Sequence, residues 1–272
     1  MTGTRTVRLR GPDGEPRSGS VHDGLVWLDG SEETIEIFDA ETLDLAEPWR
    51  LLPPVDAPEV WAAGVTYERS RDARLEESQA KDVYSHVYEA DRPELFLKDA
   101  AGRRTVGPRD AIGIRSDATW TVPEPELALV LGDYGPVAVT IGNDVSSRDI
   151  EGANPLYLPQ AKVYAGACAL GPALLVPDDW TQPFEIELRI LDEDGSVVFE
   201  GQTSTARMKR TFEELVEYVR RDNPLEPGTV LLTGTGLVPP DEVSLRPGQT
   251  VEIRIDGIGT LVNPVRRAGE LL

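Results

Sequence analysis

Residues 121–149 read TVPEPELALVLGDYGPVAVTIGNDVSSRD, and this stretch predicts the central hairpin of the fold. Two apolar runs, ELALVL and PVAVTIG, flank the turn residues DYG. We therefore expect the chain to reverse there and the two runs to pair. Pro125 precedes the first run and has no N–H to donate to a neighbouring strand. Its position predicts the start of a strand, or a strand at the edge of a sheet.

Three acidic side chains lie at one end of this hairpin. Glu124 and Glu126 are two residues apart, so on a strand they project from the same face, and the second strand returns Asp144 to their side. Three carboxylates so close repel one another unless a cation lies among them. Oxygen-only ligation predicts Mg²⁺, with Mn²⁺ or Ca²⁺ also suitable, rather than zinc. Taken alone, the pattern also fits a solvated strand face followed by an ordinary turn.

The rest of the chain is predicted to be mostly β. Runs of apolar or alternating residues separated by Gly, Pro and Asp predict strands within residues 24–30, 34–40, 184–201, 228–236 and 249–265. In the third of these ranges the residues DEDG predict a hairpin turn.

Helices are predicted at two places. Thr211 and Glu214 form a capping-box pattern ahead of apolar residues at helical spacing, and Asn223-Pro224 ends the segment. A more polar candidate covers residues 69–82. The fold class is therefore a β-rich α+β protein. A small N-terminal β region and linker is predicted over residues 1–60, before a catalytic domain over residues 61–272.

Charge and composition restrict the partners. The formal net charge of −21 argues against nucleic acid and anionic membranes, because both would repel the chain. An anionic substrate remains compatible, since a metal or a local cluster of basic residues inverts the field inside one pocket. No apolar run approaches the roughly 18 residues that cross a bilayer, and the first residues lack the apolar segment of a secretory signal. The single cysteine, Cys168, allows no internal disulfide, so we expect a cytoplasmic protein.

Four ordered segments resemble the fumarylacetoacetate hydrolase superfamily, from about residue 60 to the end of the chain. They are the Glu-X-Glu at 124–126, NDVSSRD at 143–149, the lysine segment PQAKVYAGACALGP at 159–172 and TGTG at 233–236. The resemblance implies a mixed β-sandwich or roll fold. It also implies that Glu124, Glu126 and Asp144 are the metal ligands.

The chain resembles one branch of that superfamily more closely, the 2-keto-3-deoxy-D-arabinonate (2-dehydro-3-deoxypentonate) dehydratases. Segments such as VYEADRPELFLK and TGTGLVPP carry this resemblance. This branch implies a lyase of pentose catabolism that removes water from a small anionic 2-oxo acid to give 2,5-dioxopentanoate. The resemblance nominates Glu94 as base or acid, Lys162 as the group that neutralises or protonates the substrate, and Thr235 as a hydrogen-bonding partner. It further implies a homodimer or homotetramer.

One departure from the hydrolases of the superfamily favours elimination over hydrolysis. Those enzymes carry an N-Y-x-D-H segment whose histidine helps to activate water. Here the corresponding residues are TYERS, with Arg69 and Ser70 in place of the aspartate and histidine. Arg69, Ser70 and Ser147 are predicted to contact the substrate, the arginine through a two-pronged contact with a carboxylate. Arg148 and Asp149 are expected to form an internal ion pair.

Alternatives stay open for the activity and for each nominated residue. Hydrolysis of a C–C bond in a 2,4-diketo acid, or decarboxylation of an oxo-dicarboxylate, would use the same metal site. A non-catalytic calcium-binding β module would bind metal without turnover, although Lys162 and the TGTG segment argue against it. At the level of single residues, Glu94 and Thr235 also fit plain turn positions, and Lys162 also fits a simple salt bridge.

Overall fold

The structure is a computed structural model that describes residues 2–68 and 87–272. At its centre lies the predicted hairpin, formed by β12 (Pro125–Leu131) and β13 (Pro136–Asp144). The two strands pair antiparallel, with Pro125 opposite Asn143. Strand β12 does begin at Pro125, but it has a neighbour on each side, so the alternative of an edge strand is wrong. A proline is tolerated there because it is the first residue of the strand.

A large sheet extends from both sides of the hairpin. Its other strands are β1 (Gly3–Arg10), β2 (Pro16–His22), β3 (Leu25–Leu28), β4 (Thr34–Asp39), β5 (Asp44–Leu45), β6 (Arg50–Leu51), β7 (Glu59–Gly64), β8 (Glu94–Ala100), β9 (Thr105–Val106), β15 (Cys168–Pro177) and β18 (Val230–Leu232). In the described residues the order is β5-β4-β3-β2-β1-β15-β13-β12-β18-β7-β8, with β6 beside β1 and β9 beside β15. The hairpin therefore has neighbouring strands on both sides. Its end that carries Glu124, Glu126 and Asp144 is buried.

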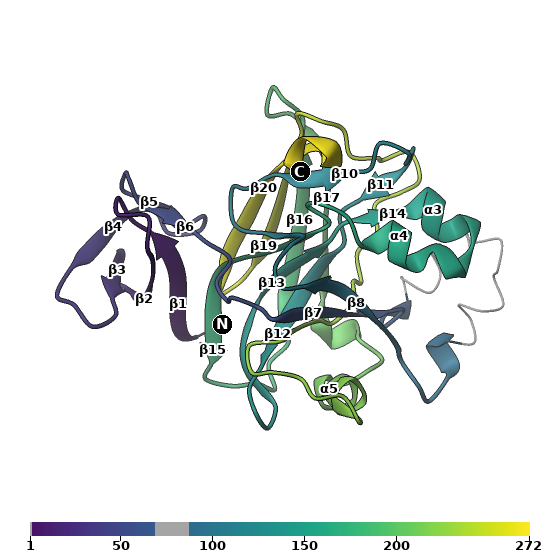
Figure 1. The fold of residues 1–272 in the computed structure, drawn as a ribbon, viewed down its shortest axis with the longest axis horizontal. Helices are drawn as coiled ribbons and strands as arrows, with labels where there is room; N and C mark the ends of the chain where they lie inside the picture. The colour runs from purple at the N-terminus through teal and green to yellow at the C-terminus, as the bar shows by residue number, and fades with distance from the viewer. Residues whose placement is uncertain (1, 69–86) are drawn as a thin grey trace.

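A second sheet packs against this centre (Figure 1). It consists of β10 (Ile112–Ile114), β16 (Glu185–Leu191), β17 (Val197–Ser204), β19 (Thr250–Ile255) and β20 (Gly259–Arg267), in the order β10-β20-β19-β16-β17. The predicted DEDG turn joins β16 to β17. One face of β12, with Leu127, Leu129 and Leu131, is buried in the main core with Ile186 and Leu188 of β16. The opposite face is buried as well, so hydrophobic burial fixes the position of β12 from both sides.

Short helices close one end of the hairpin, and a longer helix lies apart from them (Figure 1). The helical segments are α3 (Arg148–Ala153), η1 (Pro155–Tyr157), α4 (Leu158–Lys162), η2 (Thr205–Arg207), α5 (Phe212–Arg220) and η3 (Ala268–Leu271). A small sheet of β11 (Thr121–Val122) and β14 (Ser146–Ser147) leads into α3. Among the described helices, none is long and apolar enough to cross a membrane.

The predicted helix at Thr211 is confirmed as α5. The Thr211 hydroxyl accepts a hydrogen bond from the Glu214 N–H at 3.1 Å, as an N-cap should. The Glu214 carboxylate instead pairs with Arg210, so the reciprocal half of the capping box does not form. The other helix candidate, residues 69–82, lies outside the described residues.

The N-terminal strands β1 to β6 bury a hydrophobic cluster of their own, which includes Val7, Leu9 and Val26. They also continue the large sheet, because β1 pairs antiparallel with β15, with Thr6 opposite Leu174. In Figure 1 these strands project to one side of the molecule, away from the end of the hairpin that carries the three acidic residues. The division into residues 1–60 and 61–272 stays a prediction.

Candidate functional site

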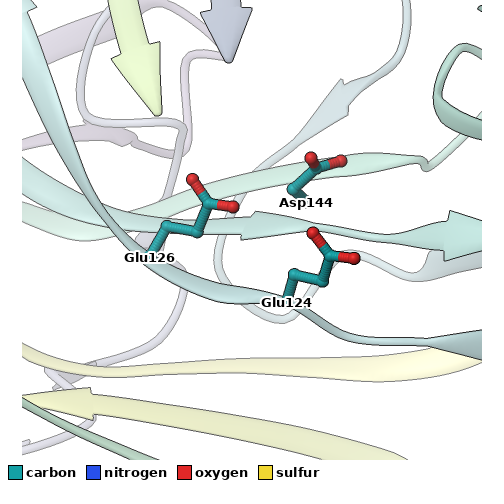
Figure 2. Close-up of side chains that lie close together, drawn as sticks. All are labelled: Glu124, Glu126 and Asp144. Atoms are coloured by element: carbon teal, nitrogen blue, oxygen red, sulfur yellow. The ribbon is translucent and has the colours of Figure 1, made fainter. Parts of the chain in front are cut away.

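The three predicted carboxylates converge at the end of the hairpin. One oxygen from each of Glu124, Glu126 and Asp144 lies within 4.8 Å of the others, and all three residues are buried (Figure 2). The backbone holds them in place, since the Asp144 N–H donates to the Glu124 carbonyl at 3.0 Å. The amide oxygen of Asn143 accepts from the Glu124 N–H at 3.2 Å. The local spacing in residues 121–149 thus builds a buried acidic cluster.

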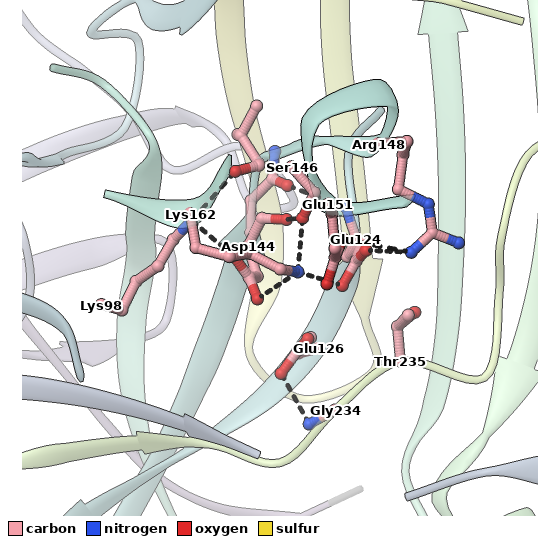
Figure 3. A network of polar contacts seen from close by, with 12 residues as sticks. Lys98, Glu124, Glu126, Asp144, Ser146, Arg148, Glu151, Lys162, Gly234 and Thr235 are labelled. Atoms are coloured by element: carbon pink, nitrogen blue, oxygen red, sulfur yellow. Dashed lines mark hydrogen bonds and ion pairs between the residues drawn. The ribbon is translucent and has the colours of Figure 1, made fainter. Parts of the chain in front are cut away.

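Lys162 binds two of these carboxylates at once. It is the last residue of α4, and its Nζ lies 3.0 Å from Oε2 of Glu124 and 3.0 Å from Oδ2 of Asp144. It also donates to the Ser146 hydroxyl at 2.5 Å (Figure 3). The ring of Phe96 lies 5.5 Å from the same ammonium. These partners explain how a lysine can be buried in a small, apolar segment.

Two further cations reach the cluster, and the sequence did not reveal either role. Lys98 of β8 is fully buried, with its Nζ 2.5 Å from Oδ1 of Asp144 and 2.9 Å from the Val145 carbonyl oxygen. The signal for it was present, because Lys98 lies in the mainly apolar run ELFLKDA, where an unpaired ammonium would be costly.

The second of these cations is Arg148, at the start of α3. It was expected to pair with Asp149, and this is wrong. Its guanidinium lies 3.1 Å from Oε1 of Glu124 and 3.7 Å from Oε2 of Glu151, another buried carboxylate. Asp149 instead accepts hydrogen bonds from the backbone and hydroxyl of Thr119. The expectation failed because the helix turns neighbouring side chains in different directions.

Glu126 is held by backbone rather than by a charged side chain. Its Oε2 accepts a hydrogen bond from the Gly234 N–H at 2.6 Å, in the TGTG segment that follows β18. Gly234 has φ +88°, and a Cβ there would lie 2.0 Å from the hydroxyl oxygen of Thr66. Only glycine fits this position. The TGTG segment therefore contributes a donor to the site, beyond plain turn chemistry.

A cavity at this end of the hairpin contains most of the other nominated residues. Its lining includes Glu94, Lys162 and Thr235 together with Glu124 and Asp144. The Thr235 hydroxyl also bonds locally, to the carbonyl and N–H of Leu237.

The remaining nominated residues are not placed in this cavity. Ser147 is buried but lies outside the cavity lining, and the neighbouring Ser146 is the serine that reaches Lys162. Arg69 and Ser70 lie outside the described residues, so their predicted contacts with substrate stay predictions.

The electrostatics of the site suit a divalent cation. Burial raises the pKa of the Glu126 carboxyl well above its usual value, and the charges of Asp144 and Glu124 raise it further, while Lys162 and the Gly234 N–H oppose them. In the described part of the site, five carboxylates (Glu94, Glu124, Glu126, Asp144 and Glu151) face three cationic groups (Lys98, Arg148 and Lys162). With all five carboxylates ionised, as a cation bound beside Glu126 would favour, the formal balance is two negative charges. Oxygen donors with that balance fit Mg²⁺.

A β-rich fold that buries such a cluster beside a cavity makes this end of the hairpin the candidate active site, with oxygen donors that could bind a cation. The chain belongs to the fumarylacetoacetate hydrolase family: residues 59–266 match the family model described as fumarylacetoacetate (FAA) hydrolase C-terminal. The resemblance that the motifs indicated is confirmed, and so is the β-rich fold class.

Individual relatives are dehydratases. The chain is 53% identical over 213 residues to a probable 2-keto-3-deoxyxylonate dehydratase of Haloferax volcanii, covering 78% of this chain and 73% of that protein. It is 46% identical over 224 residues to the 2-dehydro-3-deoxy-D-arabinonate dehydratase of Saccharolobus solfataricus, covering 80% and 75%. A solved structure of 2-keto-3-deoxy-D-arabinonate dehydratase complexed with magnesium and 2,5-dioxopentanoate is similar with a TM-score of 0.80 at 36% identity, covering 97% of this chain and 99% of that one.

Proposed function

We propose that this chain is a magnesium-dependent lyase that dehydrates a 2-keto-3-deoxypentonate to 2,5-dioxopentanoate. The observation that carries the proposal is the convergence of Glu124, Glu126 and Asp144 beside a cavity that also holds Glu94 and Lys162. Identity of 53% and 46% to two dehydratases supports the reaction type. The magnesium and 2,5-dioxopentanoate bound in the similar dehydratase structure support the cofactor and the product.

The names of the two relatives point to a single substrate. A 2-keto-3-deoxy acid retains no stereocentre at C2 or C3, so C4 is the only one left. D-Arabinonate, which the second name specifies, and the D form of xylonate share their configuration at C4. Their 2-keto-3-deoxy derivatives are therefore one compound, 2-keto-3-deoxy-D-pentonate, and we take it as the substrate of this chain.

The residues of the cavity account for the elimination. Bound Mg²⁺ polarises the 2-oxo group and so acidifies the protons on C3. The Glu94 carboxylate accepts one of these protons, the C3–H electrons form the C3–C4 double bond, and the C4–O bond breaks. Glu94 then returns this proton to the departing hydroxyl, which leaves as water, and Glu94 is again a carboxylate. Isomerisation of the unsaturated C5 alcohol to the aldehyde then gives 2,5-dioxopentanoate without any change in oxidation state overall.

Lys162 and Thr235 have supporting roles in this scheme. We assign to the Lys162 ammonium, 3.0 Å from two of the carboxylates, the positive charge that would neutralise the anionic substrate. Thr235 lines the cavity and offers a hydroxyl to the substrate. We also assign substrate contacts to Arg69, Ser70 and Ser147, on the strength of the sequence alone.

Assembly and compartment complete the proposal. We expect a homodimer or homotetramer, which light scattering after size-exclusion chromatography would establish. We also propose a cytoplasmic location, because the only cysteine of the sequence allows no internal disulfide. Cys168 is a buried free thiol, and burial raises its pKa to about 12. Such a thiol is suited to packing rather than to redox chemistry.

Mass spectrometry of the reaction products tests the activity. The purified protein is incubated with 2-keto-3-deoxy-D-pentonate and Mg²⁺, with and without EDTA, beside an Asp144→Ala variant. We expect a product lighter by one water, absent from the chelated sample and from the variant. The L enantiomer should react more slowly, because its C4 hydroxyl points differently in the same cavity.

A different product would identify a different activity. Metal-dependent cleavage of a 2,4-diketo acid, without conversion of either pentonate enantiomer, would replace dehydration with hydrolysis at the same metal site. Loss of carbon dioxide from an oxo-dicarboxylate would indicate decarboxylation. Only dehydration leaves the carbon skeleton intact, so the mass of the product separates the three.

A further inference from the structure

Each of the three carboxylates has one oxygen in contact with a group from outside the cluster, through an ion pair at Asp144 and hydrogen bonds at Glu124 and Glu126 (Figure 3). Oδ1 of Asp144 lies 2.5 Å from Nζ of Lys98, and Oε1 of Glu124 lies 3.1 Å from the Arg148 guanidinium. Oε2 of Glu126 accepts the hydrogen bond of 2.6 Å from the Gly234 N–H. Lys98 and Arg148 are buried, so their contacts are not weakened by solvent as surface ion pairs are.

The other oxygens of two carboxylates converge. Oε2 of Glu124 and Oδ2 of Asp144 both lie 3.0 Å from the same atom, Nζ of Lys162. At Glu124 and Asp144 the outer contacts therefore leave the other oxygen turned toward Lys162, inside the cluster. One oxygen from each of the three carboxylates lies within 4.8 Å of the others, a spacing that lets one cation contact all three.

A local irregularity of the sheet directs Lys98 to Asp144. In the pairing of β7 with β8, Val60 lies opposite Asp99 and the next residue, Trp61, lies opposite Leu97. Lys98 is thus the extra residue of a β-bulge. Bulges bend a strand and change the direction of a side chain, and they are frequent beside active sites. The side chain of Lys98 is fully buried and lies against the end of β13.

We propose that these outer donors restrict the site to one oxygen per carboxylate and so select Mg²⁺ over Ca²⁺, with Lys98 as the determinant at Asp144. Mg²⁺ takes a compact octahedral shell and keeps several waters, which three single oxygens allow. Ca²⁺ takes six to eight oxygens at longer distances and gains from carboxylates that bind through both oxygens. Lys98 occupies the second oxygen of Asp144 and withholds it from the larger ion.

Lys98 is accordingly a positioning residue that acts through Asp144. The inference rests on the metal site of the proposed function, but it concerns the choice of ion and not the reaction. Its test therefore measures metal binding in the absence of substrate.

Isothermal titration calorimetry with Mg²⁺ and with Ca²⁺ on the wild type and on Lys98→Met provides that test. Loss of the ammonium raises the affinity for both ions through charge alone, and to a similar extent, because both carry two positive charges. The ratio of the two dissociation constants isolates the geometric effect. We expect Lys98→Met to shift this ratio toward Ca²⁺ by about tenfold, the scale on which groups behind a metal ligand act.

Lys209→Met is the matched control. Lys209 is a partly exposed lysine that bonds to the Tyr88 carbonyl and to Glu89, away from the three carboxylates. We expect its ratio of dissociation constants to equal that of the wild type. A Lys98→Met protein whose two affinities change in parallel, with the ratio unaltered, would overturn the inference while leaving the proposed function intact. A wild-type protein that binds neither ion would remove the metal site, and both proposals with it.

A measurement on the wild type covers the case in which Lys98→Met does not fold. Difference infrared spectra on addition of Mg²⁺ report the splitting between the antisymmetric and symmetric carboxylate stretches. This splitting is wide when one oxygen binds the ion and narrow when both do. We expect wide splitting only. Narrow splitting with Mg²⁺ would show that both oxygens of a carboxylate bind the ion and would overturn the inference.

Discussion

The backbone N–H of Gly234 donates a hydrogen bond of 2.6 Å to Oε2 of Glu126, and nothing larger than glycine fits at the donor position. Gly234 has φ +88°, and an added Cβ would lie 2.0 Å from Oγ1 of Thr66, which itself donates to the Thr233 carbonyl at 2.7 Å. The orientation of a predicted metal ligand therefore depends on a backbone conformation more than 100 residues away in sequence.

Gly234→Ala should lose both stability and metal affinity. The left-handed backbone alone costs an alanine about 1–2 kcal/mol, and the contact with Thr66 adds to that cost. Gly195→Ala is the matched control, because Gly195 has φ +81° in the β16–β17 turn and nothing within 4 Å of its added Cβ. Urea unfolding and Mg²⁺ titration of both variants check the prediction. The prediction would be contradicted if Gly234→Ala and Gly195→Ala lost the same free energy of unfolding and Gly234→Ala still bound Mg²⁺ as tightly as the wild type.

Gly64→Ala should reduce turnover without weakening metal binding. Gly64 lies opposite Glu94 in the pairing of β7 with β8, and a Cβ there would be 2.1 Å from Oε2 of Glu94. The carboxylate must move, so we expect kcat to fall by about 100-fold or more, as for loss of a general base. Steady-state kinetics should give a similar loss for Glu94→Gln and none for Gly135→Ala, whose Cβ meets nothing within 4 Å. A Glu94→Gln enzyme with wild-type kcat would exclude Glu94 as the base.

Mg²⁺ should stabilise the folded protein specifically. A ligand that binds only the native state adds about 2.7 kcal/mol to the free energy of unfolding at 100 times its dissociation constant. Denaturant unfolding with Mg²⁺, and with NaCl at matched ionic strength, separates this effect from screening of the net charge of −21. Glu126→Gln keeps an oxygen for the Gly234 N–H but removes one ligand charge. Mg²⁺ should therefore increase the free energy of unfolding of this variant less than that of the wild type. Equal gains from both salts would show that Mg²⁺ acts by screening alone.

Much of the acidic cluster could be predicted because its determinants are local. Glu124 and Glu126 share a strand face, and one hairpin returns Asp144 to them within 20 residues. The helix that begins after Thr211 could likewise be predicted from its N-cap residue. In each case the pattern and the structure it specifies occupy the same short stretch of chain.

The rest of the site depends on pairings between distant segments. The contact of Lys98 with Asp144 requires β8 to pair with β7 and to bulge at Lys98. No local sequence pattern predicts that pairing or that bulge. Strand β15 was not predicted, because Gly171-Pro172 interrupts its apolar run. In the structure Ile141 lies opposite Gly171 and Val139 opposite Leu175, so Pro172 falls within an irregular part of the pairing, where its missing N–H is tolerated.

Lys162→Met should separate metal binding from catalysis. The ammonium lies 3.0 Å from Oε2 of Glu124 and 3.0 Å from Oδ2 of Asp144, so its removal leaves two buried carboxylates with less positive charge. Breaking a buried ion pair from one side costs about 3–5 kcal/mol of stability, and added Mg²⁺ should restore part of that loss because it supplies the missing charge. We therefore expect tighter Mg²⁺ binding by calorimetry, together with a fall in kcat of at least about 100-fold at saturating metal. Lys209→Met should alter neither quantity. If Lys162→Met binds Mg²⁺ more weakly than the wild type, the ammonium helps to assemble the metal site, and the role assigned to it toward the substrate would have to be abandoned.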